Sequence, residues 1–185
     1  MIAIREARLP DDAAAIAAID TSFTTGVVFD VEASSNGFAL VERRLAAPIS
    51  KRFALDDLRS DERPWSHGLV AESDGDCVAF AAAGFQAWNR RLVLWHLYVQ
   101  PPLRGRGVGR ALVERVAGLG REAGARHLWL ETSNLNVPGV AAYRALGFSL
   151  TGIDTTLYDE TSAEGEIALF FSRPIRQSEC ATSPP

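Results

Sequence analysis

Cysteine is scarce in this sequence, with Cys77 and Cys180 as the only two among 185 residues. Two isolated cysteines rule out a disulfide framework, and no ligand spacing indicates a metal site. Long hydrophobic runs are also missing, because the longest, residues 77–85, is about half as long as a membrane-spanning helix. The N-terminal residues carry charges where a signal peptide has an apolar core. We therefore expect a cytoplasmic protein with no metal and no membrane contact.

An excess of basic residues is absent as well, since 19 Lys and Arg stand against 23 Asp and Glu, for a net charge of −4. This balance predicts no nucleic-acid partner and suits a cationic substrate better. The apolar content of 47% is enough for one sizeable core. We expect a single domain over residues 1–172 and a flexible tail over residues 173–185.

The apolar patterning predicts an α/β chain. Residues 67–99 are expected to form three antiparallel strands with a tight first turn at Asp74-Gly75. Helical periodicity occurs in residues 13–23, 111–124 and 138–146. The other predicted strands are residues 2–7, 27–33, 38–46, 127–132, 148–158 and 167–173.

A glycine-rich segment lies between the apolar run 92–99 and an amphipathic stretch. Its alternating glycines allow positive φ and close approach, so backbone N–H groups can point into one concavity. A helix beginning near Val108 would add its N-terminal dipole, worth about 0.3–1 kcal/mol per charge. We expect this segment to bind a pyrophosphate, with arginines as countercharges. The predicted binding residues are Arg104, Gly105, Arg106, Gly107, Val108, Gly109 and Arg110.

Two other phosphate-binding motifs fit this segment less well. A Walker loop ends in Lys followed by Ser or Thr, whereas Arg110-Ala111 stands here. A dinucleotide fingerprint needs Gly or Ala where Arg110 follows Gly107. An ordinary glycine-rich turn remains the simplest alternative.

A second motif follows downstream, where Asn136 precedes Tyr143 by seven residues, about two helical turns. Together the two motifs resemble the GCN5-related N-acetyltransferases (GNAT), whose signature is Arg or Gln, two residues, Gly, one residue, and Gly or Ala. In that family an Asn, a Tyr and a Gly-Phe pair follow. The matching residues are Arg104, Gly107, Gly109, Asn136, Tyr143 and Gly147-Phe148.

Further segments resemble the streptothricin acetyltransferase branch of this family. They are LETSNLN, AAYRALGF, GIDTTLYDE and FALVERRLAAPISKRF, and the likeness covers roughly residues 27–172. The DTTLY segment could serve the fold or a subunit contact as readily as antibiotic recognition.

The resemblance implies a GNAT fold, with a central mixed, mostly antiparallel six- to seven-stranded sheet flanked by helices and with splayed fourth and fifth strands. It implies acetyl coenzyme A as cosubstrate, hydrogen-bonded by the backbone of Leu97, Tyr98 and Val99. Asn136 would bond the cosubstrate's pantetheine or phosphate region, or else only cap a helix. Tyr143 would protonate the departing thiolate, or else only pack the helix against the sheet.

The general base is less well defined. A free alkylammonium is neutral in only about one molecule in 2,500 at pH 7, a handicap of roughly 4.6 kcal/mol, so its deprotonation must be assisted. Family members often carry an acid on the strand that residues 91–99 occupy, and this chain has none there. His96 and Glu131 are the candidates, although a core histidine and a loop anchor are their structural alternatives. Water could also relay the proton to Glu72 or solvent.

We therefore predict an N-acetyltransferase that acetylates a primary amine of a small cationic acceptor by direct attack, with streptothricin as the leading candidate. Asp154 and Tyr158 would line the acceptor pocket, or else shape a hairpin, and residues 21–63 would supply pocket walls. Two alternatives stay open: an acetyltransferase for peptide or protein N-termini or lysines, and a non-catalytic acyl-CoA sensor. Exposed strand edges could pair two copies into a homodimer.

Overall fold

Strands β4 (His67–Ser73), β5 (Asp76–Gln86) and β6 (Arg91–Val99) form the antiparallel meander expected from the sequence. The computed structural model describes residues 1–175. Asp74 and Gly75 close the first turn at φ values of +53° and +91°, which lie in the left-handed region that a two-residue hairpin needs. Strand β1 (Ile2–Glu6) pairs with β4.

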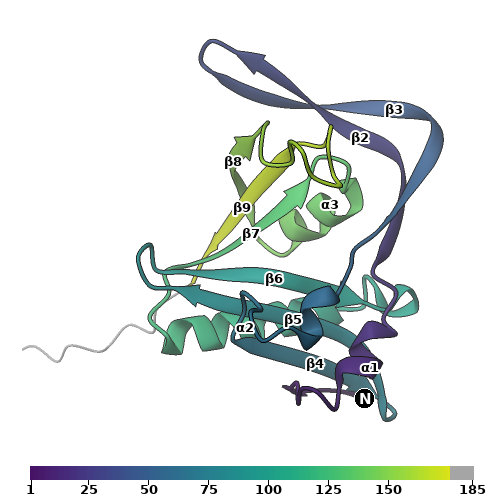
Figure 1. The fold of residues 1–185 in the computed structure, drawn as a ribbon, viewed down its shortest axis with the longest axis vertical. Coiled ribbons are helices and arrows are strands. Elements are labelled where there is room, and N and C mark those ends of the chain that lie inside the picture. Colours follow the sequence, from purple (N-terminus) through teal and green to yellow (C-terminus); the bar gives the residue numbers. More distant parts are fainter. Residues whose placement is uncertain (176–185) are drawn as a thin grey trace, which may run out of the picture.

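The complete sheet has seven strands in the order β1-β4-β5-β6-β7-β9-β8 (Figure 1). Its second half consists of β7 (His127–Ser133), β8 (Ser149–Asp154) and β9 (Ala168–Pro174). Strands β6 and β7 run parallel, whereas the other neighbouring strands in the sheet run antiparallel. The mixed, mostly antiparallel sheet predicted from the sequence is confirmed.

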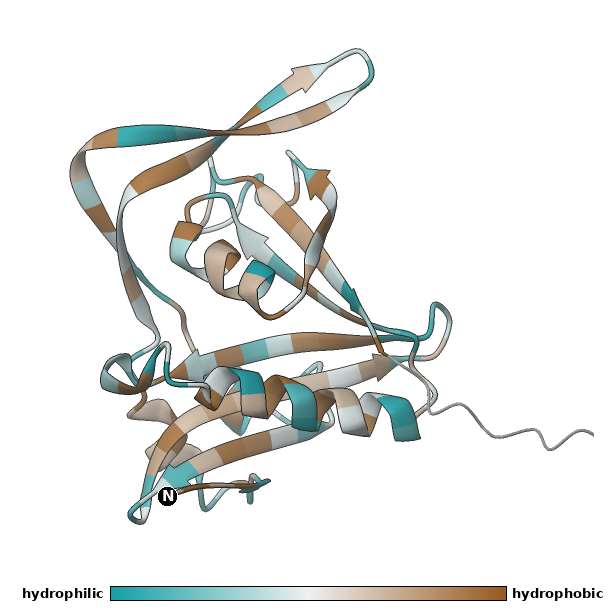
Figure 2. Cartoon of the chain, turned by 180° about the vertical axis from the view of Figure 1, so that it is seen from behind, coloured by the Kyte–Doolittle hydropathy of each residue, from teal (hydrophilic) through white to brown (hydrophobic). Residues whose placement is uncertain are grey.

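Both faces of the meander are buried. Ala79, Ala81 and Ala83 belong to the core under helix α2 (Val108–Glu122), whereas Phe80 and Ala82 belong to a second core with α1 (Ala13–Ala17) and the short helix η1 (Asp56–Arg59). Burial on both faces explains why this stretch is continuously apolar instead of alternating. In Figure 2, hydrophilic and hydrophobic patches alternate along α2, as expected for a helix with one face on the sheet.

A long two-stranded ribbon, β2 (Ser22–Ser34) with β3 (Gly37–Arg52), rises from the first half of the sheet and passes over the second (Figure 1). Both strands are longer than predicted. The helix predicted over residues 13–23 ends at Ala17, because the Asp20 carboxylate accepts a hydrogen bond from the Ser22 N–H (2.9 Å) and turns the chain into β2.

The ribbon is anchored by Asn134, at the end of β7. Its buried amide Nδ2 donates to Phe29 O (2.7 Å), and Phe29 N donates to Asn134 O (3.1 Å). Asn134 Oδ1 accepts from Ile167 N (2.8 Å), just before β9. One residue therefore joins the ribbon to the end of β7 and to the start of β9.

Two predicted boundaries near the C-terminus are wrong. Strand β8 ends at Asp154 instead of continuing to residue 158, because the Asp154 carboxylate accepts from Thr156 N (2.8 Å) in a turn. Strand β9 reaches Pro174 and Ile175 is buried, so residues 173–175 belong to the folded body rather than to the predicted tail. Residues 176–185 lie outside the described part of the chain.

Helix α3 (Val137–Ala145) follows β7, and the short helix η2 (Pro101–Leu103) follows β6. Across residues 1–175, no helix is long and apolar enough to cross a membrane.

Candidate active site

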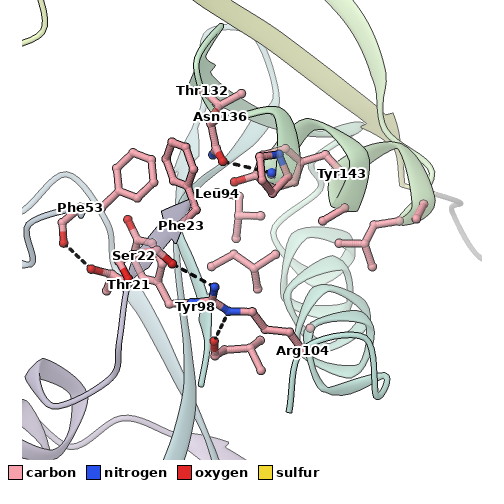
Figure 3. Close-up of a pocket in the computed structure, with 18 of the residues that line it drawn as sticks. Thr21, Ser22, Phe23, Phe53, Leu94, Tyr98, Arg104, Thr132, Asn136 and Tyr143 are labelled. Carbon is pink, nitrogen blue, oxygen red and sulfur yellow. Dashed lines mark hydrogen bonds between the residues drawn. The ribbon is translucent and has the colours of Figure 1, made fainter. Parts of the chain in front are cut away.

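Strands β6 and β7, the fourth and fifth of the sheet in order, separate after a short parallel contact. Only Arg91–Val93 pairs with His127–Trp129, so the rest of β6 is bonded to β5 alone. The gap opens into a cavity of about 660 Å³, walled by β6, β7, α2, α3 and the base of the ribbon (Figure 3). This is the splay that the sequence resemblance implied.

One end of the cavity is the glycine-rich segment. Gly105 and Gly107 have φ values of +74° and +87°, and Gly107 is the N-cap of α2 without any side-chain capping bond. A Cβ at either glycine would meet no atom within 4 Å, so the space above this backbone is open. Gly109 lines the same end. The geometry is that of an anion-binding helix N-terminus.

Arg104 lines this end but is also an anchor. Its guanidinium donates to three backbone carbonyls: Ser22 O (2.9 Å; Figure 3), Val99 O (2.9 Å) and Asp20 O (2.8 Å). It thereby joins the end of β6 to the start of β2 while keeping its positive charge near the open backbone.

The other residues predicted to bind the pyrophosphate differ in whether they line the cavity. Arg110 lines the cavity and donates to Ala145 O (2.8 Å) at the end of α3. Arg106 is exposed and is not part of the cavity wall, and the Val108 side chain is buried in the core. Arg106 and Val108 could therefore contribute only charge at long range and a backbone N–H, respectively.

Leu97, Tyr98 and Val99 lie on the part of β6 that no strand pairs on the β7 side, and all three line the cavity. Backbone groups along such an edge can hydrogen-bond an extended ligand as a further strand would. The Tyr98 ring lies 6.0 Å from the Phe53 ring, and burial raises the pKa of its hydroxyl.

Tyr143, on α3, points into the middle of the cavity (Figure 3). Its ring packs against Phe148 and Phe171, with ring centres 6.1 and 6.3 Å away. Burial and, to a smaller extent, the charge of Glu131 together raise the pKa of Tyr143 to about 12. The residue thus has both the packing role and the cavity position that the sequence left as alternatives.

Asn136 lines the cavity, but its amide is already engaged. Oδ1 accepts from Gly139 N (3.0 Å) as the N-cap of α3, and Nδ2 donates to Thr132 Oγ1 (2.9 Å). The capping role that was the structural alternative is therefore present, and it fixes the start of the helix that carries Tyr143.

The opposite end of the cavity is acidic. Glu131, on β7, accepts a short hydrogen bond from the Tyr158 hydroxyl. Burial against the cavity wall raises the pKa of Glu131, whereas the bond from Tyr158 and the charge of Lys51 lower it. Lys51 is paired with Glu166 at 2.5 and 2.6 Å. Glu131, Tyr158 and Lys51 all line the cavity.

His96 is not part of the cavity wall. Trp95 forms a β-bulge, since Ala82 pairs with His96 and Ala83 pairs with Leu94. His96 packs in the second core, with Nε2 2.8 Å from Asp57 Oδ2, which also accepts from Trp65 Nε1. The structure thus places His96 as a packed core histidine, its structural alternative.

Asp154 and Glu72 also lie away from the cavity wall. Asp154 forms the turn after β8, and the hydrogen bonds from Thr156 lower its pKa. Glu72 accepts from Arg5 at 2.6 and 2.9 Å. Among residues 1–175, no cluster of His, Cys, Asp or Glu side chains is grouped as a metal site.

Several wall residues were not singled out in the sequence. The predicted region 21–63 does supply cavity walls, but through Thr21, Ser22, Phe23, Lys51 and Phe53 in particular. The sequence did contain a feature that could have drawn attention to Lys51, because it is the only lysine in the chain.

Comparisons with known proteins agree with this geometry. A model of the acetyltransferase (GNAT) family matches residues 38–148. Streptothricin acetyltransferase of Streptomyces lavendulae is 45% identical over 92% of this chain and 93% of that protein. Streptothricin acetyltransferase of Escherichia coli is 31% identical over 81% of this chain and 83% of that protein.

Solved structures show the same fold. The crystal structure of nourseothricin acetyltransferase has a TM-score of 0.84 and 45% identity, covering 95% of this chain and 99% of that one. A Bacillus anthracis protein solved with acetyl coenzyme A has a TM-score of 0.80 at 21% identity, covering 94% and 99%. At that identity the second likeness concerns the fold alone.

Proposed function

Because this chain belongs to the acetyltransferase (GNAT) family, we propose that the cavity between β6 and β7 acetylates an amine of a small cationic acceptor, with streptothricin as the leading candidate. The chain is an acetyl-CoA-dependent N-acetyltransferase, as the sequence predicted. The observation that carries the proposal is that one cavity holds three groups. The glycine-rich backbone that can bind an anion lies at one end, the neutral phenol of Tyr143 in the middle and the Glu131 carboxylate at the other end.

The cavity suits acetyl coenzyme A, which supplies an activated acetyl thioester when bound. Gly105 and Gly107 leave open backbone where a pyrophosphate can approach, and Arg104 and Arg110 place positive charge there. The unpaired edge of β6 then offers hydrogen bonds along the way to Tyr143. These residues bind and orient the cosubstrate toward the acidic end.

Glu131 is the proposed general base. Its raised pKa makes the carboxylate a better proton acceptor for the acceptor's ammonium than an ordinary surface glutamate. It lies at the acidic end, so the same negative charge also attracts the cation. Deprotonation frees the nitrogen lone pair for direct attack on the acetyl group.

Tyr143 is the proposed donor to the departing sulfur. With a pKa near 12 the phenol stays protonated at neutral pH. A thiol has a pKa of about 8.5, so the thiolate is a weaker base than the Tyr143 phenolate would be. Tyr143 thus keeps its proton and donates a hydrogen bond to the departing sulfur. Tyr143 therefore stabilises negative charge that develops on sulfur, and solvent can complete the protonation.

The proposal is tested by measuring coenzyme A release with streptothricin, aminoglycosides, polyamines, free amino acids and short peptides. Turnover with streptothricin above all others supports the proposal. Preference for peptides would favour the peptide or protein acetyltransferase instead. Tight acetyl coenzyme A binding without turnover of any acceptor would favour the sensor.

The cytoplasmic location and the homodimer also stay proposals. Strand β8 is an edge of the sheet, with Leu150 and Leu157 exposed at and just beyond it, and two such edges could pair. Sedimentation equilibrium would test the homodimer, and a monomer at all concentrations would exclude it.

A further inference from the structure

Lys51 lines the acidic end of the cavity, whereas its partner Glu166 is not part of the cavity wall. Nζ contacts both carboxylate oxygens of Glu166, at 2.5 and 2.6 Å, and lies 5.7 Å from the centre of the Phe53 ring. Its charge also acts on Glu131, whose carboxylate faces the same cavity. A primary alkylammonium is therefore held by the Glu166 carboxylate near an aromatic ring, next to the end of the cavity where the acceptor's ammonium is proposed to bind.

The pair joins two segments that are distant in sequence. Lys51 lies at the end of β3, and Glu166 lies in the segment between β8 and β9, 115 residues away in sequence. The Lys51 side chain is 28% exposed and that of Glu166 is 12% exposed. Breaking such a partly buried pair is costly when no other cation replaces Lys51, because the Glu166 carboxylate is then left unpaired. Exchanging one ammonium for another costs little, because the same charge-assisted hydrogen bonds are remade.

The identity of the cation matters to this exchange. Lys51 is the only lysine in the sequence, and the other strongly basic side chains are arginines. An arginine would hold the Glu166 carboxylate with a rigid two-pronged contact, whereas the lysine ammonium is a compact charge on a flexible stem. The cation at this position is therefore chemically equivalent to an acceptor amine and can swing away from it.

We propose that Glu166 anchors a second ammonium of the acceptor, which displaces Lys51, so that diamines are the preferred substrates. One amine of the diamine is acetylated beside Glu131 and Tyr143 while the other is held by Glu166. This inference rests on the proposed acetylation of a cationic acceptor in this cavity.

The test uses Glu166→Gln and Lys51→Met with two acceptors: the diamine 3,6-diaminohexanamide (β-lysine amide), and the monoamine 3-aminohexanamide, which lacks its terminal amine. Glu166→Gln should raise the diamine KM about fivefold, the size expected of a partly exposed charge pair. Lys51→Met removes the competing cation and should lower the diamine KM about threefold. Because the charge of Lys51 also lowers the pKa of Glu131, the kinetics are measured at a pH above the acid limb of every variant. There the monoamine KM and the acetyl coenzyme A KM should change much less than the diamine KM.

A matched control comes from the ribbon. Arg43 pairs with Asp30 at 2.6 Å, outside the cavity wall, so Arg43→Met should leave both acceptor KM values unchanged. Thermal melting of each variant shows whether it is folded. Glu166→Asp, which keeps the charge, replaces Glu166→Gln should that variant unfold, and its diamine KM should rise less than fivefold.

Opposite shifts in the diamine KM support the proposal. Parallel increases in the KM of both acceptors would show that the pair only holds the fold together. Unchanged KM values would show that the pair does not contact the acceptor. Either result overturns the proposal. If no acceptor is turned over, the proposed function fails, and calorimetric titration of the coenzyme A-bound protein with β-lysine amide decides instead. Opposite Kd shifts then support the second-ammonium site, and parallel or absent shifts overturn it.

Discussion

Tyr143 combines a packing role with a chemical one, and the two can be separated because phenylalanine keeps the ring. Tyr143→Phe preserves the contacts with Phe148 and Phe171 but removes the hydroxyl. We expect kcat to fall about 10²-fold, the usual size of a lost hydrogen bond to charge that develops in the transition state, with acetyl coenzyme A affinity unchanged. Steady-state kinetics and calorimetry measure the two effects. An unchanged kcat at every pH would remove Tyr143 from the chemistry.

Glu131 sets the acid limb of the pH profile. Its pKa is raised, so the carboxylate takes up a proton, and activity is lost, at a higher pH than for an ordinary glutamate. The bond from Tyr158 lowers that pKa, so Tyr158→Phe should move the acid limb of kcat/KM to higher pH. Glu131→Gln should abolish the limb and lower kcat/KM about 10²-fold. A limb that Glu131→Gln leaves in place would assign it to another group.

At the scale of an element, the junction of η2 and α2 depends on backbone that only glycine adopts cheaply. Gly107 has φ of +87°, so Gly107→Ala should lower the free energy of unfolding by about 1–2 kcal/mol. The added methyl group also enters the open anion cradle and should weaken acetyl coenzyme A binding several-fold. Urea unfolding and calorimetry measure these two effects.

Gly118 is the matched control for this substitution. It lies inside α2, where an added Cβ meets no atom within 4 Å. Gly118→Ala should therefore raise the free energy of unfolding by about 0.5–1 kcal/mol and leave acetyl coenzyme A binding unchanged. Equal effects of the two substitutions would contradict the role given to Gly107.

At the scale of the whole molecule, Asn134 connects the ribbon to the second half of the sheet. Asn134→Ala leaves Phe29 O and Ile167 N without their side-chain partners. A buried unpaired group costs about 1–3 kcal/mol, and the hydrogen bond to Ile167 N is only partly buried, so we expect the free energy of unfolding to fall by about 2–4 kcal/mol. The acceptor KM should rise more than the acetyl coenzyme A KM, because the ribbon supplies the cavity wall with Phe23, whose ring lies 5.8 Å from the Phe53 ring at the acidic end.

Asn36→Ala is the control for this prediction, since Asn36 is exposed in the ribbon's turn. It should change stability by no more than about 0.5 kcal/mol. Urea unfolding and steady-state kinetics compare the two variants. Equal KM changes for both substrates in Asn134→Ala would argue that the ribbon does not shape the acceptor end in particular.

The sequence by itself determined the features that depend on neighbouring residues. The meander follows from short apolar runs separated by turn residues such as Asp74 and Gly75, and the anion-binding backbone follows from glycine spacing before a helix. Tyr143 could be placed on a helix near the cavity for the same reason. These patterns were enough to predict the family, the mixed sheet and the cosubstrate.

Only the tertiary structure decided which distant side chains share the cavity. One bulged residue, Trp95, separates the paired positions of Leu94 and His96, and His96 packs in the second core beside Asp57, 39 residues away. Lys51 meets Glu166 across 115 residues because the ribbon folds over the second half of the sheet. Such contacts depend on strand register and on long-range packing, which local periodicity does not encode.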